Sequence, residues 1–457
     1  MNSFHTHTDT IIAPATPHGI SALAIIRLSG NEAISLAAKV FTGKDLTSMP
    51  SHRVAVGFIQ DEGRILDEVV VTVFRKPRSY TCEDMVEISC HGSPVVVREI
   101  INLFTRMGAR LAMPGEFTRR AFLNGRLDLA QAEAVADIIH AETENARQAA
   151  MNQMRGGFSK EIKQLREQLI DFAALIELEL DFGEEDVEFA RRDELKALVQ
   201  RILDFTEKLI ASFASGNVIK NGIPTVIAGK PNAGKSTLLN ALLNEERAIV
   251  SDIPGTTRDT IEDEIILGGL LFRFIDTAGL RHTTDLIEAK GVERTRQYMQ
   301  RAALILYLID LTLATEQDVR EQEEDLKKLN IPYLLIGNKT DKLTADELEK
   351  WKSFPMVFIS ASAGTNLDEL KQRILEKFHF EQVKPGDVLV TNARHYQSLV
   401  ETRDALKRVL EGLEKQISGE LLAFDIRQAQ HHLGEITGSI TSEDLLDSIF
   451  SRFCIGK

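Results

Sequence analysis

The sequence predicts a multidomain protein: an N-terminal α+β domain, a discontinuous α-helical domain, and a P-loop α/β domain inserted into the helical one. Three observations predict this architecture. The 457 residues with 43 % hydrophobic content suffice for about three cores. Strand-like and helical patterns alternate between about residues 220 and 380, and long helical patterns flank that segment on both sides. Insertion at an exposed loop is the simplest arrangement that accounts for this order.

The first segment, to about Met113, contains short apolar runs with turn signals between them. A single helical stretch, residues 95–107, accompanies them. This mixture is typical of an α+β domain. The expected strands are 22–28, 54–59, 69–74 and 86–89.

Helical periodicity dominates after Pro114-Gly115. Ala, Leu, Glu, Gln and Arg prevail through Ile219, with apolar residues at three- and four-residue spacing, which indicates long packed helices. The same periodicity resumes in residues 398–417 and 421–436, and one more short helix is expected within 443–457.

The segment from Thr225 to about Phe380 alternates apolar strand-like runs with amphipathic helices. This order is the signature of a parallel sheet covered on both faces. The expected strands are 225–228, 272–275, 304–309, 333–336 and 356–359.

Residues 229–236 read GKPNAGKS, a complete P-loop between a strand and the helical stretch 237–243. Its glycines let backbone N–H groups surround phosphate oxygens. Lys235 would reach the β- and γ-phosphates, and the Ser236 hydroxyl would bind Mg²⁺. A chance glycine-rich turn is a poor alternative in this context.

Three further motifs follow in order: DTAG at 276–279, NKTD at 338–341 and SAS at 360–362. Together they resemble the GTPase superfamily, in which the NKxD aspartate, here Asp341, accepts two hydrogen bonds from guanine that adenine does not supply. A polar loop at 251–259 matches a first switch. The predicted GTP-binding residues are Asn232, Ala233, Gly234, Lys235, Ser236, Thr237, Ser251, Asp252, Ile253, Pro254, Gly255, Thr256, Thr257, Asp276, Thr277, Ala278, Gly279, Asn338, Lys339, Asp341, Ser360, Ala361 and Ser362.

Hydrolysis needs a group that orients the attacking water. Ras-type GTPases place a glutamine directly after DxxG, but this chain has Leu280 there. Glu288, in the loop before Gly291, is the candidate replacement; the alternative is a solvated acidic residue. Asn232 could hold a K⁺ ion against the phosphates in place of an arginine finger.

Charge and cysteine content limit the partners and the compartment. The net charge of −14 argues against non-specific binding to nucleic acid, so any RNA partner must meet a local basic patch or a second protein. Three scattered cysteines favour a reducing cytosol over a disulfide framework. The N-terminus has no signal-peptide pattern and no apolar run spans a bilayer, so a cytoplasmic protein is expected.

Five further motifs are SYTCED (79–84), CHG (90–92), PGEFT (114–118), LNGRLDLAQAEA (123–134) and the terminal FCIGK (453–457). They resemble the motifs of the MnmE (TrmE) tRNA-modification GTPases, and the resemblance covers essentially the whole chain. In that family a glycine is usual at the position of Cys82 in the first motif, and another glycine is usual at the position of Ser93.

The resemblance implies a homodimer that works with a FAD-dependent MnmG (GidA) partner, as a heterotetramer. It implies addition of a carboxymethylaminomethyl or aminomethyl group to C5 of the wobble uridine of certain tRNAs. The one-carbon unit would come from 5,10-methylenetetrahydrofolate or a formyl-tetrahydrofolate. The implied domains are 1–120, folate-binding and dimerising; 121–219, helical; 220–380, GTPase; and 381–457, helical with the Cys-Ile-Gly-Lys terminus.

The resemblance also assigns residues to each ligand. Glu288 orients the water, and Cys454 is a candidate functional thiol beside Lys457, or else a small buried hydrophobe. A carboxylate suits the amidine-like edge of a pterin, and cations suit a glutamate tail. The assigned ligands are Asn232, Ser251, Ile253 and Thr256 for K⁺, Ser236 and Thr257 for Mg²⁺, and Arg27, Glu87, Arg126 and Lys457 for folate.

Three other functions stay open from sequence. A ribosome-assembly GTPase of the Era or Der kind would need a KH module or a second GTPase domain, and neither is seen. A GTP-gated scaffold would leave all group transfer to the partner. A folate-dependent methyltransferase for a small molecule or protein would use GTP only for regulation.

Overall fold

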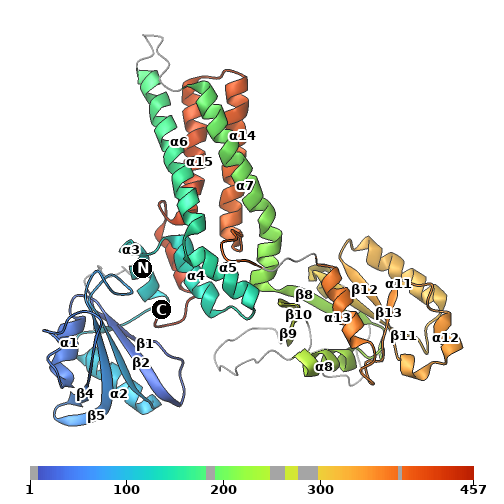
Figure 1. The fold of residues 1–457 in the computed structure, drawn as a ribbon, viewed down its shortest axis with the longest axis horizontal. Helices are drawn as coiled ribbons and strands as arrows, with labels where there is room; N and C mark the ends of the chain where they lie inside the picture. The colour runs from blue at the N-terminus through green and yellow to red at the C-terminus, as the bar shows by residue number, and fades with distance from the viewer. Residues whose placement is uncertain (1–8, 182–190, 247–262, 276–296, 379–382) are drawn as a thin grey trace. The chain divides into compact units, whose positions relative to one another are not determined.

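The computed structural model describes residues 9–181, 191–246, 263–275, 297–378 and 383–457. The chain divides into two compact units, whose elements are labelled in Figure 1. Each unit combines segments that are distant in the sequence, as an inserted domain requires. The finer division at residues 120, 219 and 380 stays a prediction. The first unit is Met1–Ile139, Gln153–Thr206 and Gln397–Lys457, and the second is His140–Asn152 and Glu207–Tyr396.

A seven-stranded sheet forms the amino-terminal part of the first unit, in the order β3-β4-β5-β6-β2-β1-β7. Neighbouring strands are antiparallel, except β1 and β7. The four predicted strands are confirmed as β2, β4, β5 and β6, while β1, β3 and β7 are too short to show an alternating pattern. The bounds are β1 Ile11–Pro14, β2 Ser21–Ser29, β3 Phe41–Thr42, β4 Arg53–Asp61, β5 Arg64–Phe74, β6 Met85–Gly92 and β7 Arg110–Leu111.

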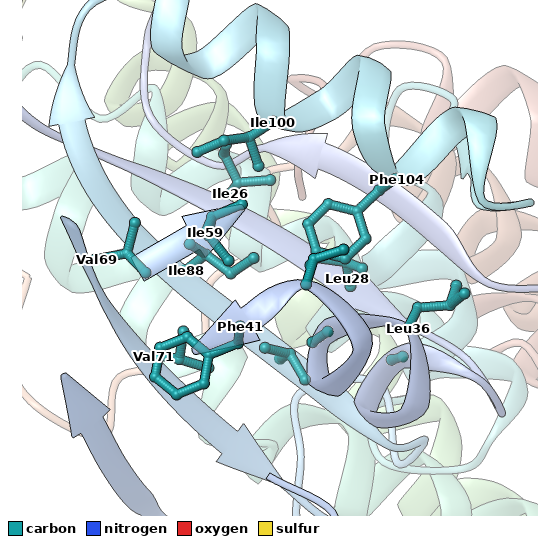
Figure 2. Packing of buried hydrophobic residues seen from close by; sticks show 14 of the residues in the cluster. Ile26, Leu28, Leu36, Phe41, Ile59, Val69, Val71, Ile88, Ile100 and Phe104 are labelled. Atoms are coloured by element: carbon teal, nitrogen blue, oxygen red, sulfur yellow. The ribbon is translucent and has the colours of Figure 1, made fainter. Parts of the chain in front are cut away.

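One face of this sheet is buried under α1 (Ala33–Val40) and α2 (Pro94–Arg106). Figure 2 shows Ile26 and Ile88 of the sheet close to Ile100 of α2, and all three side chains are fully buried. Burial of each such side chain contributes about 1.5–3 kcal/mol. This contact explains the apolar periodicity of residues 95–107, since α2 turns that stripe toward the sheet.

The first unit continues as a helical part in which α6 and α15 lie side by side (Figure 1). Arg166 of α6 donates a hydrogen bond from Nε to the carbonyl oxygen of Gln430 of α15, 3.1 Å away. The three predicted C-terminal helices are confirmed as α14, α15 and α16. No described helix is long and apolar enough to cross a membrane. The helices of this unit are α3 Glu116–Leu123, α4 Leu129–Ile139, α6 Gly157–Asp181, α15 Gly419–Thr437 and α16 Glu443–Phe450. The unit boundaries fall within α7 Arg192–Asn221 and α14 Ala393–Glu414, and α5 Glu144–Met154 lies mostly in the second unit.

The second unit contains a six-stranded sheet in the order β13-β12-β11-β8-β10-β9. The five predicted strands are confirmed as a parallel set, and an unpredicted β9 pairs antiparallel with β10. One buried cluster contains Leu306 of β11 and another contains its neighbour Ile305, so both faces of β11 are covered. The strands are β8 Ile223–Gly229, β9 Asp263–Leu267, β10 Leu270–Phe274, β11 Leu304–Asp310, β12 Tyr333–Asn338 and β13 Met356–Phe358.

The helices of the second unit complete a doubly covered α/β fold. The predicted fold class, with an α+β part, a discontinuous helical part and an inserted P-loop α/β part, is thereby confirmed. The helices are α8 Lys235–Glu246, α11 Glu316–Lys328, α12 Ala345–Glu349, α13 Leu367–Glu376 and the 3₁₀ turn Thr340–Lys342.

Candidate functional site

The P-loop connects the end of β8 to the first residue of α8. Gly229 and Gly234 have φ of 145° and 98°, in a region that side chains disfavour. A Cβ on Gly229 would overlap the carbonyl oxygen of Leu308, and one on Gly234 would overlap the side-chain amide of Asn338. Only glycine fits at both positions, so the backbone can curve into the N–H-lined loop that holds phosphate.

Lys235 folds back over this loop. Its ammonium group donates hydrogen bonds to the carbonyl oxygens of Gly229, at 2.9 Å, and Lys230, at 3.0 Å. Burial lowers the pKa of the Lys235 ammonium group below its ordinary value. A lysine anchored in this way is positioned as a point charge for the phosphates of a nucleotide.

Asn338 connects the P-loop to the loop that follows β13. Its side-chain Nδ2 donates to the carbonyl oxygen of Ala233, 2.8 Å away, and its Oδ1 accepts from the backbone N–H of Ala361 at 3.0 Å. The residue is only 3 % exposed, so both bonds are shielded from water. The NKTD and SAS motifs are therefore held against the P-loop, as the sequence predicts for one nucleotide site.

The rest of the NKTD motif is ordered by side-chain contacts. Asp341 Oδ1 accepts a hydrogen bond from the Ser360 hydroxyl at 2.6 Å, and Ser360 in turn lies 3.3 Å from the Ser362 hydroxyl. Lys339 has a left-handed backbone, φ 69°, and its ammonium group lies 2.5 Å from Asp310 Oδ2. The Asp341 carboxylate is exposed, which leaves it accessible to a base.

The sequence analysis did not select Asp310, whose carboxylate pairs with Lys339 of the NKTD motif. Burial opposes its charge, but hydrogen bonds from Lys339 and Thr312 outweigh this and hold the pKa of the Asp310 carboxyl below its ordinary value. Asp310 ends β11 at the carboxyl edge of the parallel sheet, where ligands bind in this architecture. That position at a strand end was the signal that could have identified it.

Part of the predicted site lies outside the described residues. The described part is Asn232, Ala233, Gly234, Lys235, Ser236 and Thr237 of the P-loop, together with the residues of NKTD and SAS. Ser236 and Thr237 lie in the first turn of α8, and Asn232 is exposed with a left-handed φ of 59°. The switch residues Ser251, Asp252, Ile253, Pro254, Gly255, Thr256 and Thr257, the motif Asp276, Thr277, Ala278 and Gly279, and Glu288 lie outside the described residues.

A second cluster gathers all four predicted folate residues in the first unit. Arg27 Nη2 lies 2.7 Å from Glu87 Oε1 on the adjacent strand, and its Nη1 donates to the carbonyl oxygen of Gly456 at 3.0 Å. The guanidinium groups of Arg27 and Arg126 each lie 5.2 Å from the Tyr80 ring centroid, and Lys457 Nζ lies 6.0 Å from it. Tyr80, which the sequence reasoning did not select, is the aromatic centre of this cluster.

The C-terminal tail is part of this cluster. The backbone N–H of Phe117 donates to the carbonyl oxygen of Lys457 at 3.2 Å, so the tail docks against α3. Burial and the nearby Arg27 lower the pKa of the Lys457 ammonium group. Cys454 is exposed, so the interpretation of this thiol as a small buried hydrophobe is wrong.

Cys82 has a left-handed backbone with φ of 61°. Glycine adopts this conformation without steric cost. Ser93 instead has an ordinary extended backbone, φ −91° and ψ 125°, at the N-terminus of α2. Thus a side chain is easily accepted at residue 93 and is strained at residue 82.

Two models of known protein families match most of the chain. Residues 10–126 match the GTP-binding protein TrmE N-terminus, and residues 129–454 match the MnmE helical domain. A tRNA modification GTPase MnmE of Cytophaga hutchinsonii is 58 % identical over 452 residues, which cover 99 % of this chain and 98 % of the relative. Relatives of the same description are 51 % identical in Christiangramia forsetii and 47 % identical in Bacteroides fragilis, each covering 98 % of this chain and 99 % of the relative. The chain belongs to the MnmE family of tRNA modification GTPases and is a GTP hydrolase.

Proposed function

We propose that this chain is a K⁺-activated GTPase that modifies C5 of the wobble uridine, position 34, of certain tRNAs. With an MnmG (GidA)-like flavoprotein that carries FAD, it adds a carboxymethylaminomethyl or aminomethyl group derived from a tetrahydrofolate. The observation that supports the GTP step is the P-loop itself. Lys235 is hydrogen-bonded to the backbone of this loop, and Asn338 connects the loop to the predicted base-binding loops.

Guanine selection rests on Asp341. The 2.6 Å hydrogen bond from Ser360 fixes one carboxylate oxygen, and the exposed carboxylate is free to accept two N–H groups from guanine. Asp341→Asn replaces one acceptor with a donor and is expected to weaken GTP binding and favour xanthosine triphosphate, which carries an oxygen at that edge. Retained preference for GTP in Asp341→Asn would remove this role.

The metal sites rest on the P-loop side chains. The hydroxyl of Ser236, in the first turn of α8, together with Thr257 suits Mg²⁺, which prefers oxygen ligands. The exposed, left-handed Asn232 can present a carbonyl oxygen to K⁺ beside the phosphates, with Ser251, Ile253 and Thr256 as further ligands. K⁺ bound there would supply positive charge to the phosphates, as an arginine finger does.

A potassium titration tests this proposal. GTP turnover is expected to rise with K⁺ and to stay low in equal Na⁺, while Glu288→Ala is expected to abolish turnover without loss of GTP binding. Asn232→Ala should remove the potassium response. Equal turnover in sodium and potassium buffers contradicts K⁺ activation.

The cluster around Tyr80 fits a reduced folate chemically. Glu87 can accept two hydrogen bonds from a pterin, and Arg27, Arg126 and Lys457 can bind carboxylates. Glu87→Gln is expected to weaken binding of 5-formyltetrahydrofolate at least about tenfold, which corresponds to about 1.4 kcal/mol. Glu68→Gln, an exposed glutamate on β5, is the matched control, and equal affinity of both variants would contradict the site.

The homodimer is supported by an uncovered apolar row on β4. Val54, Val56 and Phe58 alternate with buried residues and are 55 %, 63 % and 38 % exposed. A contiguous exposed apolar surface of this kind typically marks a protein interface. Val56→Asp is expected to give monomers by light scattering, whereas Val95→Asp, at an exposed valine on α2, is expected to leave the dimer intact.

The tRNA step is tested with the reconstituted pair. Mass analysis of wobble uridines should show the new group only when chain, flavoprotein partner, GTP and tetrahydrofolate are all present. Cys454→Ala separates the two roles of the exposed thiol: loss of modification with GTP turnover retained assigns it to the chemistry, and unchanged modification favours a GTP-gated scaffold. The net charge of −14 suggests that the partner supplies much of the tRNA-binding surface, and we propose a cytoplasmic location for the complex.

A further inference from the structure

A cluster of one histidine and two glutamates lies between α14 and α15, and it shares no residue with either site described above. His432 Nδ1 is 3.0 Å from Glu401 Oε2 and 3.1 Å from Glu435 Oε2. The three atoms all lie within 4.8 Å of one another. In a tetrahedral Zn²⁺ site with bonds of about 2.0–2.1 Å, ligand atoms are about 3.3 Å apart. The cluster is therefore already close to the size of a metal site.

The helix geometry directs these side chains to one place. His432 and Glu435 are three residues apart on α15, so they lie on the same face. Glu401 reaches them from the neighbouring α14. Metal sites in helical bundles are built in this general way, from histidine and carboxylate side chains that project inward from facing helices.

Neighbouring polar groups orient both carboxylates. Gln397 Nε2 donates to Glu401 Oε1 at 2.7 Å, which directs Oε2 toward His432. The Ser398 hydroxyl lies 3.4 Å from Glu435 Oε2. Such outer hydrogen bonds, which fix the direction of a ligand, are a regular part of metal sites.

We propose that Glu401, His432 and Glu435 bind a first-row transition-metal dication, with Zn²⁺ as the fitting probe. The ligands are Nδ1 of His432 and one oxygen of each carboxylate, and water completes the coordination. The imidazole nitrogen favours such a metal over Mg²⁺ or Ca²⁺, which take oxygen ligands. The two carboxylates balance the charge of the ion, and the bound metal joins α14 to α15.

The competing explanation is an ion pair, in which a protonated His432 simply bridges the two carboxylates. Zn²⁺ titration of the full-length chain, freed of metal with a chelator and kept in excess Mg²⁺ without nucleotide, separates the two. The wild type is expected to bind one Zn²⁺ more per chain than His432→Gln. Glu401→Gln is expected to weaken that binding by more than the roughly 10- to 100-fold that loss of an outer hydrogen bond costs.

The matched control is His91→Gln. His91 Nδ1 also pairs with a carboxylate, Asp67 Oδ1 at 2.7 Å, but with only one among the residues that the structure describes, so this variant should bind Zn²⁺ as the wild type does. Zinc X-ray absorption should show oxygen and imidazole ligands for the ion that His432→Gln loses. Equal Zn²⁺ stoichiometry in wild type and His432→Gln, or sulfur ligation of that ion, would overturn the proposal.

Discussion

The side-chain amide of Asn338 donates a 2.8 Å hydrogen bond to the carbonyl oxygen of Ala233, in the middle of the P-loop. The same side chain accepts a bond from the N–H of Ala361. One buried residue thus links the phosphate-binding loop to both base-side motifs. Because its two partners are backbone groups, the link depends on the fold and is independent of the side chains at 233 and 361.

Asn338→Ala tests this link. The change leaves a buried acceptor and a buried donor without their partner, which is expected to lower the free energy of unfolding by about 2–3 kcal/mol. GTP affinity should fall at least about tenfold. Urea unfolding and titration with a fluorescent GTP analogue measure both. Asn221→Ala, which removes an exposed hydrogen bond to Asn217, is the control, and matching values for the two variants would contradict the link.

Gly456→Ala tests the docking of the C-terminal tail. Gly456 has φ of 93°, and a Cβ there would overlap the carbonyl oxygen of Pro14. We expect a loss of about 1–3 kcal/mol, and weaker folate binding because the Arg27 bond to the Gly456 carbonyl is displaced. Gly63→Ala is the control, since Gly63 has a similar φ of 86° with open space around it. Equal folate affinity in both variants would show that the tail does not shape that cluster.

Cys82 is predicted to be a strained residue. Its φ of 61° costs a non-glycine residue about 1–2 kcal/mol. Replacement by glycine removes this cost but adds about 0.5–1 kcal/mol, because glycine has more conformational freedom to lose on folding. Cys82→Gly should therefore raise the free energy of unfolding by up to about 1.5 kcal/mol. Cys82→Val should lower it, because a β-branched side chain resists this conformation, and Cys82→Ser should change little. Urea unfolding midpoints that decrease in the order Cys82→Gly, Cys82→Ser, Cys82→Val would agree with the prediction.

Acid sensitivity is predicted for a partly buried ion network. Burial raises the pKa values of the Asp9 and Glu116 carboxyls, but hydrogen bonds and attraction from Arg110 and Arg120 outweigh this and lower both. Because both pKa values are lower in the folded chain, the two carboxylates stabilise the fold fully at a pH above their ordinary pKa values, about 3.9 for Asp and 4.3 for Glu. This stabilisation is lost as the pH falls through the pKa values of the folded chain.

Glu116→Gln tests the direction of this effect. At pH 7 it is expected to cost about 3 kcal/mol, since it breaks a largely buried pair, and the fall in stability below pH 5 should become shallower. Glu99→Gln, which breaks the exposed pair with Arg64, should cost less than about 1 kcal/mol. An unchanged acid slope in Glu116→Gln would contradict the network.

Local patterns predicted most of the strands and helices and the P-loop. Residues 225–228 and 304–309 are largely apolar runs, and they lie within β8 and β11. The antiparallel β9 was not predicted, because its five residues carry Asp263 and Glu264 and acquire their partner only from the hairpin with β10. Tyr80 and Asp310 were missed for a related reason: their neighbours, Arg27 and Lys339, are distant in sequence.

The sequence by itself determined the fold class and the guanine nucleotide chemistry, because glycine spacing, charge and apolar period act between residues that are close along the chain. Only the tertiary structure decided that Gly456 of the tail meets Arg27, that Asn338 holds the P-loop, and that His432 lies between Glu401 and Glu435. These contacts join residues from separate elements. Their formation depends on how buried faces pack, and no local pattern records that packing.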